Sequence, residues 1–119
     1  MKLRSLLTAA AFATAAVVGI VAEAKAQDRS LWLYDGQSSN VQGYFVSGEA
    51  IYATCDGDCY DLDLFLYDSA GRLVAQDVEL DSAPVVIAPY EGDFTIEVSM
   101  PNCTHSSGCA AWVASDYGF

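Results

Sequence analysis

Hydrophobic residues recur at every second position in several segments of the chain. In the segment 62–67, Leu62, Leu64 and Leu66 alternate with Asp63, Phe65 and Tyr67. The segment 94–100 repeats the pattern, with its apolar residues at alternate positions. A two-residue period is typical of a strand that buries one face. We therefore predict that the leucines point into a core and that their neighbours point outward.

Turn residues divide the chain into short strands, and no segment has a helical period. Gly48 lies inside the predicted strand 42–53 as a bulge or break. The turn 68–71 joins the predicted strand 62–67 to its hairpin partner, 72–80. Strands spaced in this way predict an all-β fold, a two-layer antiparallel β-sandwich of about seven or eight strands. We predict strands at 31–34, 42–53, 62–67, 72–80, 84–88, 94–100 and 110–114.

The first 26 residues have the layout of a secretory signal peptide. Lys2 and Arg4 precede an uncharged run over 6–22, and small residues before Ala26 suit signal peptidase. We expect cleavage after Ala26, a single domain at 27–119, and a periplasmic or secreted protein without stable membrane insertion after processing. The alternative is an uncleaved membrane anchor, which normally needs about 20 apolar residues.

The remaining 93 residues are strongly acidic. Only Arg29 and Arg72 face 15 carboxylates, which gives a net charge of −13 over 27–119. Such a surface repels phosphate backbones, so a nucleic-acid-binding function is excluded. Divalent cations, basic partners or a need for solubility would each suit this charge.

Four cysteines lie in two short segments, 55–59 and 103–109. An even number of cysteines in an exported chain favours disulfides. We expect the local pairing, with Cys55 bonded to Cys59 and Cys103 bonded to Cys109. The alternative is a zinc site that uses these cysteines with His105, but their spacing differs from that of the common zinc fingers.

Two segments carry a resemblance to a known family. The segment 61–71 (DLDLFLYDSAG) resembles the central motif of bacterial pre-peptidase C-terminal (PPC) domains, and 88–98 (APYEGDFTIEV) resembles their closing motif. The resemblance implies a jelly-roll-like β-sandwich similar to collagen-binding domains. It also implies adhesion to a substrate, with calcium bound in some members. The paired cysteine segments are not part of the family's pattern.

An acidic cluster and a set of aromatic residues are the candidate binding groups. Asp56, Asp58, Asp61 and Asp63 could supply oxygen ligands to calcium, which takes six to eight of them. The alternative is a solvated acidic edge that discourages aggregation.

Aromatic side chains could form a ligand-binding surface for sugars, peptides or proteins. The candidates are Tyr60, Phe65, Tyr67 and Trp112. Phe65 and Tyr67 would share a face with Asp61 and Asp63. The alternative is that this face packs under the second sheet.

The sequence argues against an enzyme. His105 is the only histidine, and its neighbouring serines are too close in sequence to form a catalytic triad with it. We therefore expect an exported, non-catalytic module that binds a protein or carbohydrate ligand, with calcium as a candidate cofactor. The alternative is a structural or accessory envelope protein that docks onto a basic partner through its acidic face. Neither the ligand nor the oligomeric state can be predicted from the sequence.

Overall fold

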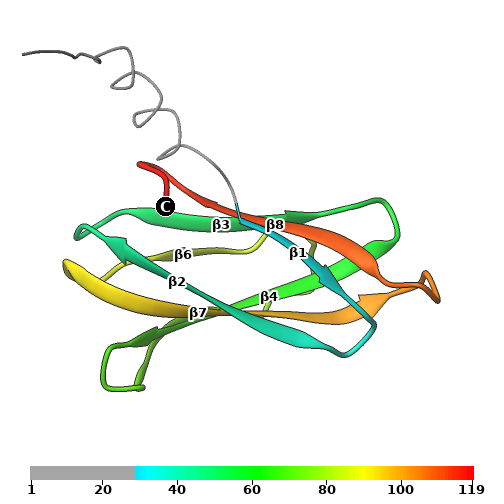
Figure 1. Ribbon diagram of the computed structural model, residues 1–119, viewed down its shortest axis with the longest axis horizontal. Coiled ribbons are helices and arrows are strands. Elements are labelled where there is room, and N and C mark those ends of the chain that lie inside the picture. Colours follow the sequence, from blue (N-terminus) through cyan, green and yellow to red (C-terminus); the bar gives the residue numbers. More distant parts are fainter. Residues whose placement is uncertain (1–28) are drawn as a thin grey trace, which may run out of the picture.

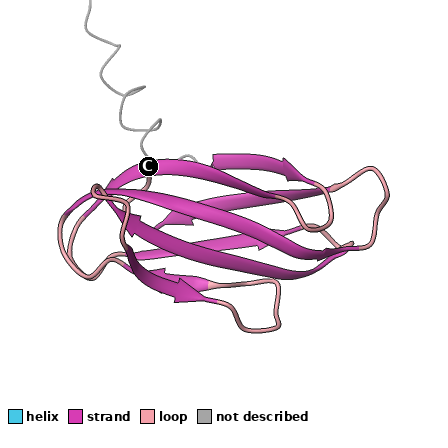
Figure 2. Ribbon diagram, turned by 90° about the horizontal axis from the view of Figure 1, so that it is seen from below, coloured by secondary structure: helices cyan, strands magenta, loops and turns pink. Residues whose placement is uncertain are grey.

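The structure, a computed structural model, describes residues 29–119. This part of the chain consists of strands and loops and has no helix (Figure 2). The predicted signal peptide lies outside the described residues. Within 29–119, no helix is present that is long and apolar enough to cross a membrane. The strands are β1 (Arg29–Leu33), β2 (Ser38–Phe45), β3 (Ala50–Cys55), β4 (Cys59–Asp68), β5 (Leu73–Asp77), β6 (Val85–Ile87), β7 (Gly92–Cys103) and β8 (Cys109–Ser115).

The eight strands form two antiparallel sheets, one with the order β1-β8-β3-β6 and the other with the order β2-β7-β4-β5. Figure 1 shows β3, β8 and β1 in the upper layer and β2, β7 and β4 in the lower layer. This is the strand order of a jelly roll, in which each strand except β5 lies in the other sheet from the strand before it. The predicted two-layer β-sandwich is therefore confirmed.

The core fills the space between the sheets and comes from alternate positions of the strands. Leu62, Leu64 and Leu66 of β4 are fully buried, as the alternation predicted. The apolar positions of β7 are buried as well, and they pack against the inward residues of the other sheet. The largest side chains of this core are Phe45, Phe94, Leu33, Ile51, Leu62, Leu64, Leu66, Ile96 and Met100.

One predicted strand is two strands. The segment 42–53 was expected to be a single strand with a bulge or break at Gly48. It is instead the end of β2, a tight turn and the start of β3, and the two strands belong to different sheets. Gly48 has a φ of +85°, and the main-chain N–H of Glu49 donates to the carbonyl of Val46 at 3.1 Å. A glycine with positive φ ends a strand here because it lets the chain reverse direction.

The predicted hairpin is confirmed. β4 pairs with β5 in antiparallel register, and the N–H of Gly71 donates to the carbonyl of Asp68 at 2.9 Å to close the turn. Gly71 has a φ of +84°, a conformation that glycine adopts at little cost.

Both disulfides have the expected local pairing, Cys55 with Cys59 and Cys103 with Cys109. Each links a strand of one sheet to a strand of the other, since one joins β3 to β4 and the other joins β7 to β8. Cys59 and Cys103 are paired residues in the β4–β7 ladder. The two crosslinks therefore lie side by side and fasten the same end of the sandwich.

Candidate functional site

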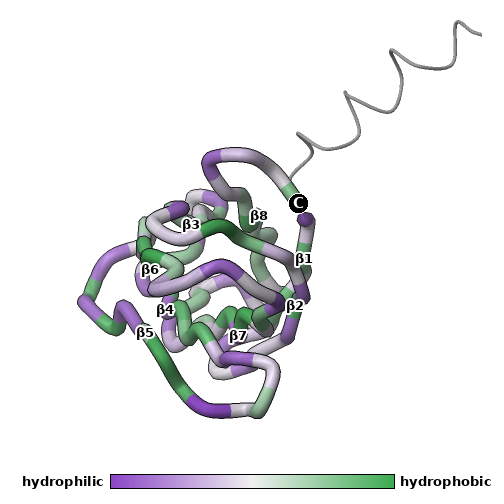
Figure 3. The backbone as a smooth tube through the Cα atoms, turned by 90° about the vertical axis from the view of Figure 1, so that its left-hand side faces the viewer, coloured by the Kyte–Doolittle hydropathy of each residue, from purple (hydrophilic) through white to green (hydrophobic). Residues whose placement is uncertain are grey.

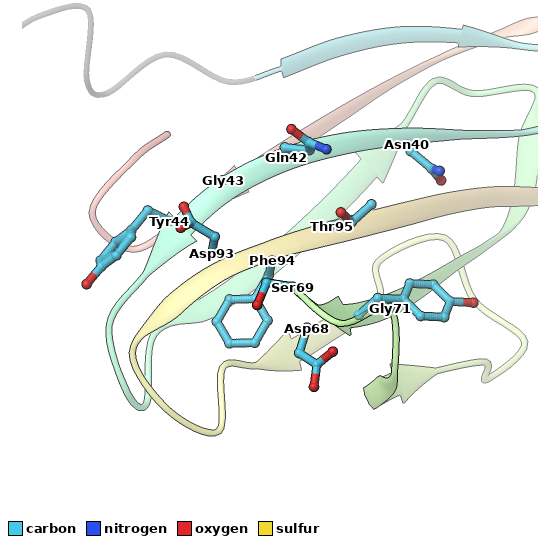
Figure 4. A pocket seen from close by; sticks show the side chains of 11 residues that line it. Asn40, Gln42, Gly43, Tyr44, Asp68, Ser69, Gly71, Asp93, Phe94 and Thr95 are labelled. Atoms are coloured by element: carbon cyan, nitrogen blue, oxygen red, sulfur yellow. The ribbon is translucent and has the colours of Figure 1, made fainter.

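A groove of about 570 Å³ lies on the outer face of the sheet β2-β7-β4-β5, near the end opposite the disulfides. Figure 4 shows its side chains projecting from β2 and β7 and from the turn that follows β4. The groove is lined by Asn40, Gln42, Gly43, Tyr44, Tyr67, Asp68, Ser69, Gly71, Asp93, Phe94 and Thr95.

Strand alternation places polar groups in the groove. On β2, Asn40, Gln42 and Tyr44 are exposed, while the positions between them point toward the core. On β7, Asp93 and Thr95 face outward in the same manner. Because β2 and β7 are paired neighbours, these side chains gather on one surface.

Two tyrosine hydroxyls fix carboxylates at the groove. Tyr44 Oη donates to Glu91 Oε2 at 2.7 Å, and Tyr67 Oη donates to Glu97 Oε1 at 3.0 Å. The hydrogen bond to the glutamate raises the pKa of each tyrosine above its ordinary value of 10.0. Both phenols therefore stay protonated and act as donors, and each holds its carboxylate in a defined position.

The turn after β4 forms one wall and is organised by Asp68. Its Oδ1 accepts the main-chain N–H groups of Ala70 and Arg72, both at 2.9 Å. Its Oδ2 accepts from Arg72 Nε at 3.0 Å and from Tyr90 Oη at 3.3 Å. The hydrogen bond from the Arg72 N–H, followed by the guanidinium contact, lowers the pKa of Asp68 below 3.8.

The charge balance of the groove is negative. No lining residue is a cation, and Arg72 of the adjoining turn is already paired with Asp68 at 3.0 Å. Glu91, Asp93 and Glu97 have no cationic partner within the described part of the chain. No lining residue is a histidine or a cysteine. The groove can therefore accept cationic and hydrogen-bonding groups.

The four predicted calcium ligands are not brought together. In residues 29–119, no group of three or more His, Cys, Asp or Glu side chains has a geometry that could hold a metal ion. Asp56 uses both of its oxygens within the protein, accepting from the N–H of Asp58 at 3.2 Å and from that of Ala110 at 2.8 Å. Asp58 is exposed in the loop, whereas Asp61 is only 8% exposed.

Irregular pairing explains the position of Asp61. The β4–β7 register shifts on both sides of this residue, which breaks the alternation expected from the leucines. The sequence had suggested that both Asp61 and Asp63 share a face with Phe65 and Tyr67. In the structure Asp63 does so and Asp61 does not. One buried oxygen of Asp61 and one of Asp63 have no hydrogen-bond partner in the protein. Burial, followed by the charges of Asp61, Asp77 and Asp81, raises the pKa of Asp63. Of these acidic neighbours, only Asp61 belongs to the predicted set.

The predicted aromatic residues are divided between the two faces of the sandwich. Phe65 and Tyr67 lie half-buried on the outer face of the groove sheet, so this face does not pack under the second sheet. Trp112 lies on the outer face of the other sheet, and Tyr60 is exposed beside the disulfides. Alternation reveals that a residue points outward but not on which sheet it lies, and the structure does not bring the four candidates onto one surface.

Sequence reasoning also missed residues that the structure makes prominent. Tyr44 and Asp93 form part of the groove, and Trp32 lies on the outer face of the other sheet. Tyr44 and Asp93 are paired opposite each other in the β2–β7 ladder. No short-range pattern marks that pairing, because the two residues are far apart in the sequence.

Comparison with known proteins supports the fold. No protein-family description and no curated protein matches the chain, so the resemblance to PPC domains stays a prediction. Among the matching solved structures is that of Aeromonas hydrophila PliG, a periplasmic lysozyme inhibitor of g-type lysozyme. It has a TM-score of 0.50 and 10% sequence identity, and the match covers 78% of this chain and 88% of PliG. At this identity the likeness shows a shared β-sandwich fold.

Proposed function

We propose that this chain is an exported, non-catalytic binding domain that holds a basic segment of a protein partner in the groove of the β2-β7-β4-β5 sheet. The observation that carries the proposal is a groove lined by Asp93, with Arg72 already paired and with Glu91 and Glu97 hydrogen-bonded to the lining residues Tyr44 and Tyr67. An arginine or lysine side chain entering the groove would meet Asp93, and the tyrosine hydroxyls hold Glu91 and Glu97 in place on the tyrosines that line it. Fixed acceptors bind a cation well because little ordering remains to be done.

Two further observations support an extracytoplasmic protein partner. The disulfides are typical of proteins in oxidising compartments. PliG has a similar fold and is a periplasmic inhibitor of g-type lysozyme. We therefore take g-type lysozyme as the first natural partner to test.

The groove has a second candidate ligand, a carbohydrate. The amides of Asn40 and Gln42 lie beside Tyr44, whose ring is half exposed. Amides and an aromatic ring are groups that bind sugar hydroxyls and sugar faces. Salt separates the two candidates, because ionic docking weakens as ionic strength rises and sugar binding responds little.

The test uses the processed domain, isotope-labelled for NMR, and an oligo-arginine peptide as the probe. We expect shifts of the main-chain amides at Asn40, Gln42 and Thr95, and an affinity that falls steeply between low and physiological salt. Asp93→Asn should weaken binding about tenfold, as expected for the loss of one hydrogen-bonded ion pair. Asp58→Asn is the matched control, because it removes the same charge from an exposed loop elsewhere.

Shifts confined to the disulfide end, or equal effects of the two variants, would count against the groove. A g-type lysozyme titration then tests the partner itself. We expect one-to-one binding and loss of lysis, both weakened by Asp93→Asn. Lysozyme binding that is insensitive to salt and to Asp93 would contradict the proposed mode.

A further inference from the structure

The sheet β1-β8-β3-β6 has an unusual charge distribution. None of its four strands contains an aspartate or a glutamate. All carboxylates of residues 29–119 lie in the other sheet or in loops. The only charged residue in these four strands is Arg29, whose guanidinium lies 5.1 Å from the centre of the Phe119 ring. The segment 27–119 has a net charge of −13, yet the strands of this sheet carry no carboxylate side chain.

The outer side of this sheet is apolar and exposed. Figure 3 shows β8, β3 and β6 together, with many residues in hydrophobic colours, whereas β2 is coloured mainly purple and white. We call this outer side the apolar face. Its large side chains are Trp32 (55% exposed), Trp112 (37%), Tyr52 (38%), Val85 (46%) and Ile87 (50%).

Strand pairing makes the apolar face continuous. Ala114, Tyr52 and Val85 form one row across β8, β3 and β6, and Trp112 lies in the next row. The remaining outward positions are small and uncharged, namely Ser30, Thr54, Ala50, Ala110 and Ala114. These outward positions carry no charged group that would oppose their burial.

Trp32 is held in place on this face. Its Nε1 donates to the carbonyl of Ser107 at 2.8 Å, within the loop that the Cys103–Cys109 disulfide closes. A rigid aromatic side chain loses little conformational entropy when it becomes buried, and such residues commonly contribute most of the binding energy of an interface.

We propose that the apolar face is the contact surface of a homodimer, in which two copies of this chain bury Trp32, Tyr52 and Trp112 against each other. The charge distribution favours a second copy of this chain as the partner on this face. Two copies of a domain with a net charge of −13 repel each other wherever their carboxylates meet. The apolar face is the surface through which they can approach without opposing like charges. A basic partner, in contrast, is attracted to the acidic groove on the opposite sheet.

The area available predicts a weak dimer. The exposed parts of the five large side chains amount to several hundred Å². A standard stable interface buries about 800 Å² on each partner. The small uncharged positions around the large side chains supply part of the remainder. We therefore expect dissociation in the micromolar range rather than a permanent dimer.

The chain contains its own reporter of this contact. Its only two tryptophans, Trp32 and Trp112, both lie on the apolar face. Sedimentation equilibrium and tryptophan emission of the processed domain should be measured from about 1 µM to 1 mM, a range that brackets the expected dissociation constant. We expect a monomer–dimer transition, with the emission moving to shorter wavelength and becoming protected from acrylamide as the dimer forms.

Substitutions that place a positive or a negative charge at the centre of the apolar face test whether this face is buried in the dimer. Tyr52→Glu and Tyr52→Lys should each raise the dissociation constant by on the order of 100-fold, because a buried unpaired charge is costly whatever its sign. Leu80→Glu and Leu80→Lys are the matched controls, since Leu80 is exposed on the loop between β5 and β6 and is not an outward position of the four strands. If the Tyr52 variants lose their fold by circular dichroism, Ile87→Glu at the edge strand β6 replaces them.

Salt should affect dimerisation in the opposite direction to oligo-arginine binding in the groove. The dimer should tighten as salt rises, because screening reduces the repulsion between two acidic copies. A protein that remains monomeric up to about 1 mM would overturn the proposal, since that range extends far beyond the expected micromolar constant. A dimer that is unaffected by both Tyr52 variants would also overturn it, as would an apolar face that binds another protein while the chain stays monomeric. Loss of oligo-arginine binding would leave the dimer untouched, so the two proposals fail separately.

Discussion

The indole nitrogen of Trp32 lies 2.8 Å from the main-chain carbonyl oxygen of Ser107 and donates a hydrogen bond to it. The bond joins β1 to the loop between β7 and β8, residues 75 positions apart in the sequence. Gly108 makes this approach possible. A Cβ atom at Gly108 would lie 2.5 Å from Trp32 Nε1 and 3.1 Å from the carbonyl oxygen of Leu33.

Gly108→Ala should destabilise the domain and displace Trp32. The added methyl group would clash with the indole, and the φ of +97° at this position is strained for any side chain. We expect a loss of about 2 kcal/mol in the free energy of unfolding, measured by urea denaturation. Tryptophan emission should change as well, because the indole can no longer keep its hydrogen bond. Gly57→Ala is the control, since a Cβ there meets no atom within 4 Å.

Replacing Glu49 should also be costly, because this glutamate is buried and hydrogen-bonded. Glu49 is 3% exposed and accepts three hydrogen bonds, from the N–H of Val46, the hydroxyl of Ser115 and the N–H of Tyr117. Glu49→Ala leaves these donors without their acceptor, and we expect a loss of about 2–3 kcal/mol in urea denaturation. The same change at exposed Glu79 should cost little. Equal losses would show that the bonds contribute nothing.

The sequence could predict the fold where a single short segment carries the information. The leucines of 62–67 occupy alternate positions, and that spacing alone assigns their burial. The role of Gly48 was left open as a bulge or break, because a glycine within an apolar run can mark either a bulge or a turn. The choice depends on whether β2 and β3 belong to one sheet, and the strands with which they pair decide that.

The candidate sites were harder to predict because both surfaces depend on long-range pairing. The groove needs β2 beside β7, and the apolar face needs β1 beside β8, which brings Trp32 onto the same outer face as Trp112. Composition identified the acidic residues but could not show that Asp56 accepts hydrogen bonds from Asp58 and from Ala110 of β8, or that Asp61 is buried by irregular pairing. Spacing along one strand therefore suggested a calcium cluster that the described residues do not form.

Asp68→Asn should weaken the β4–β5 turn at neutral pH. The Arg72 N–H and guanidinium lower the pKa of Asp68 below 3.8, so the folded state binds fewer protons than the unfolded state. The stabilisation is complete above pH 3.8 and is lost as the pH falls through the lowered pKa. Thermal melting at pH 7 should show a lower midpoint for the variant, and the difference should shrink toward pH 3. A constant difference at every pH would mean that the charge of Asp68 plays no part.

Asp63→Asn should have the opposite effect and stabilise the protein at neutral pH. Burial, followed by the charges of Asp61, Asp77 and Asp81, raises the pKa of Asp63 above its ordinary value of 3.8. The folded state therefore binds more protons than the unfolded state between the two values, and ionised Asp63 is a penalty at every higher pH. Removing the charge should raise the melting midpoint at pH 7 by a few degrees, since about 1 kcal/mol shifts a domain of this size by about 4–8 °C.

The pH profile separates this effect from a general loss of negative charge. The gain from Asp63→Asn should disappear below about pH 4, where the aspartate of the parent protein is itself protonated. Measurements in the presence of a chelator keep any cation from neutralising the site. Asp58→Asn removes one exposed carboxylate from the loop before β4 and should give a smaller gain at pH 7. Equal melting midpoints for the two variants at pH 7 would contradict this prediction. The gain would then come from a general reduction of negative charge and not from the burial and acidic neighbours of Asp63.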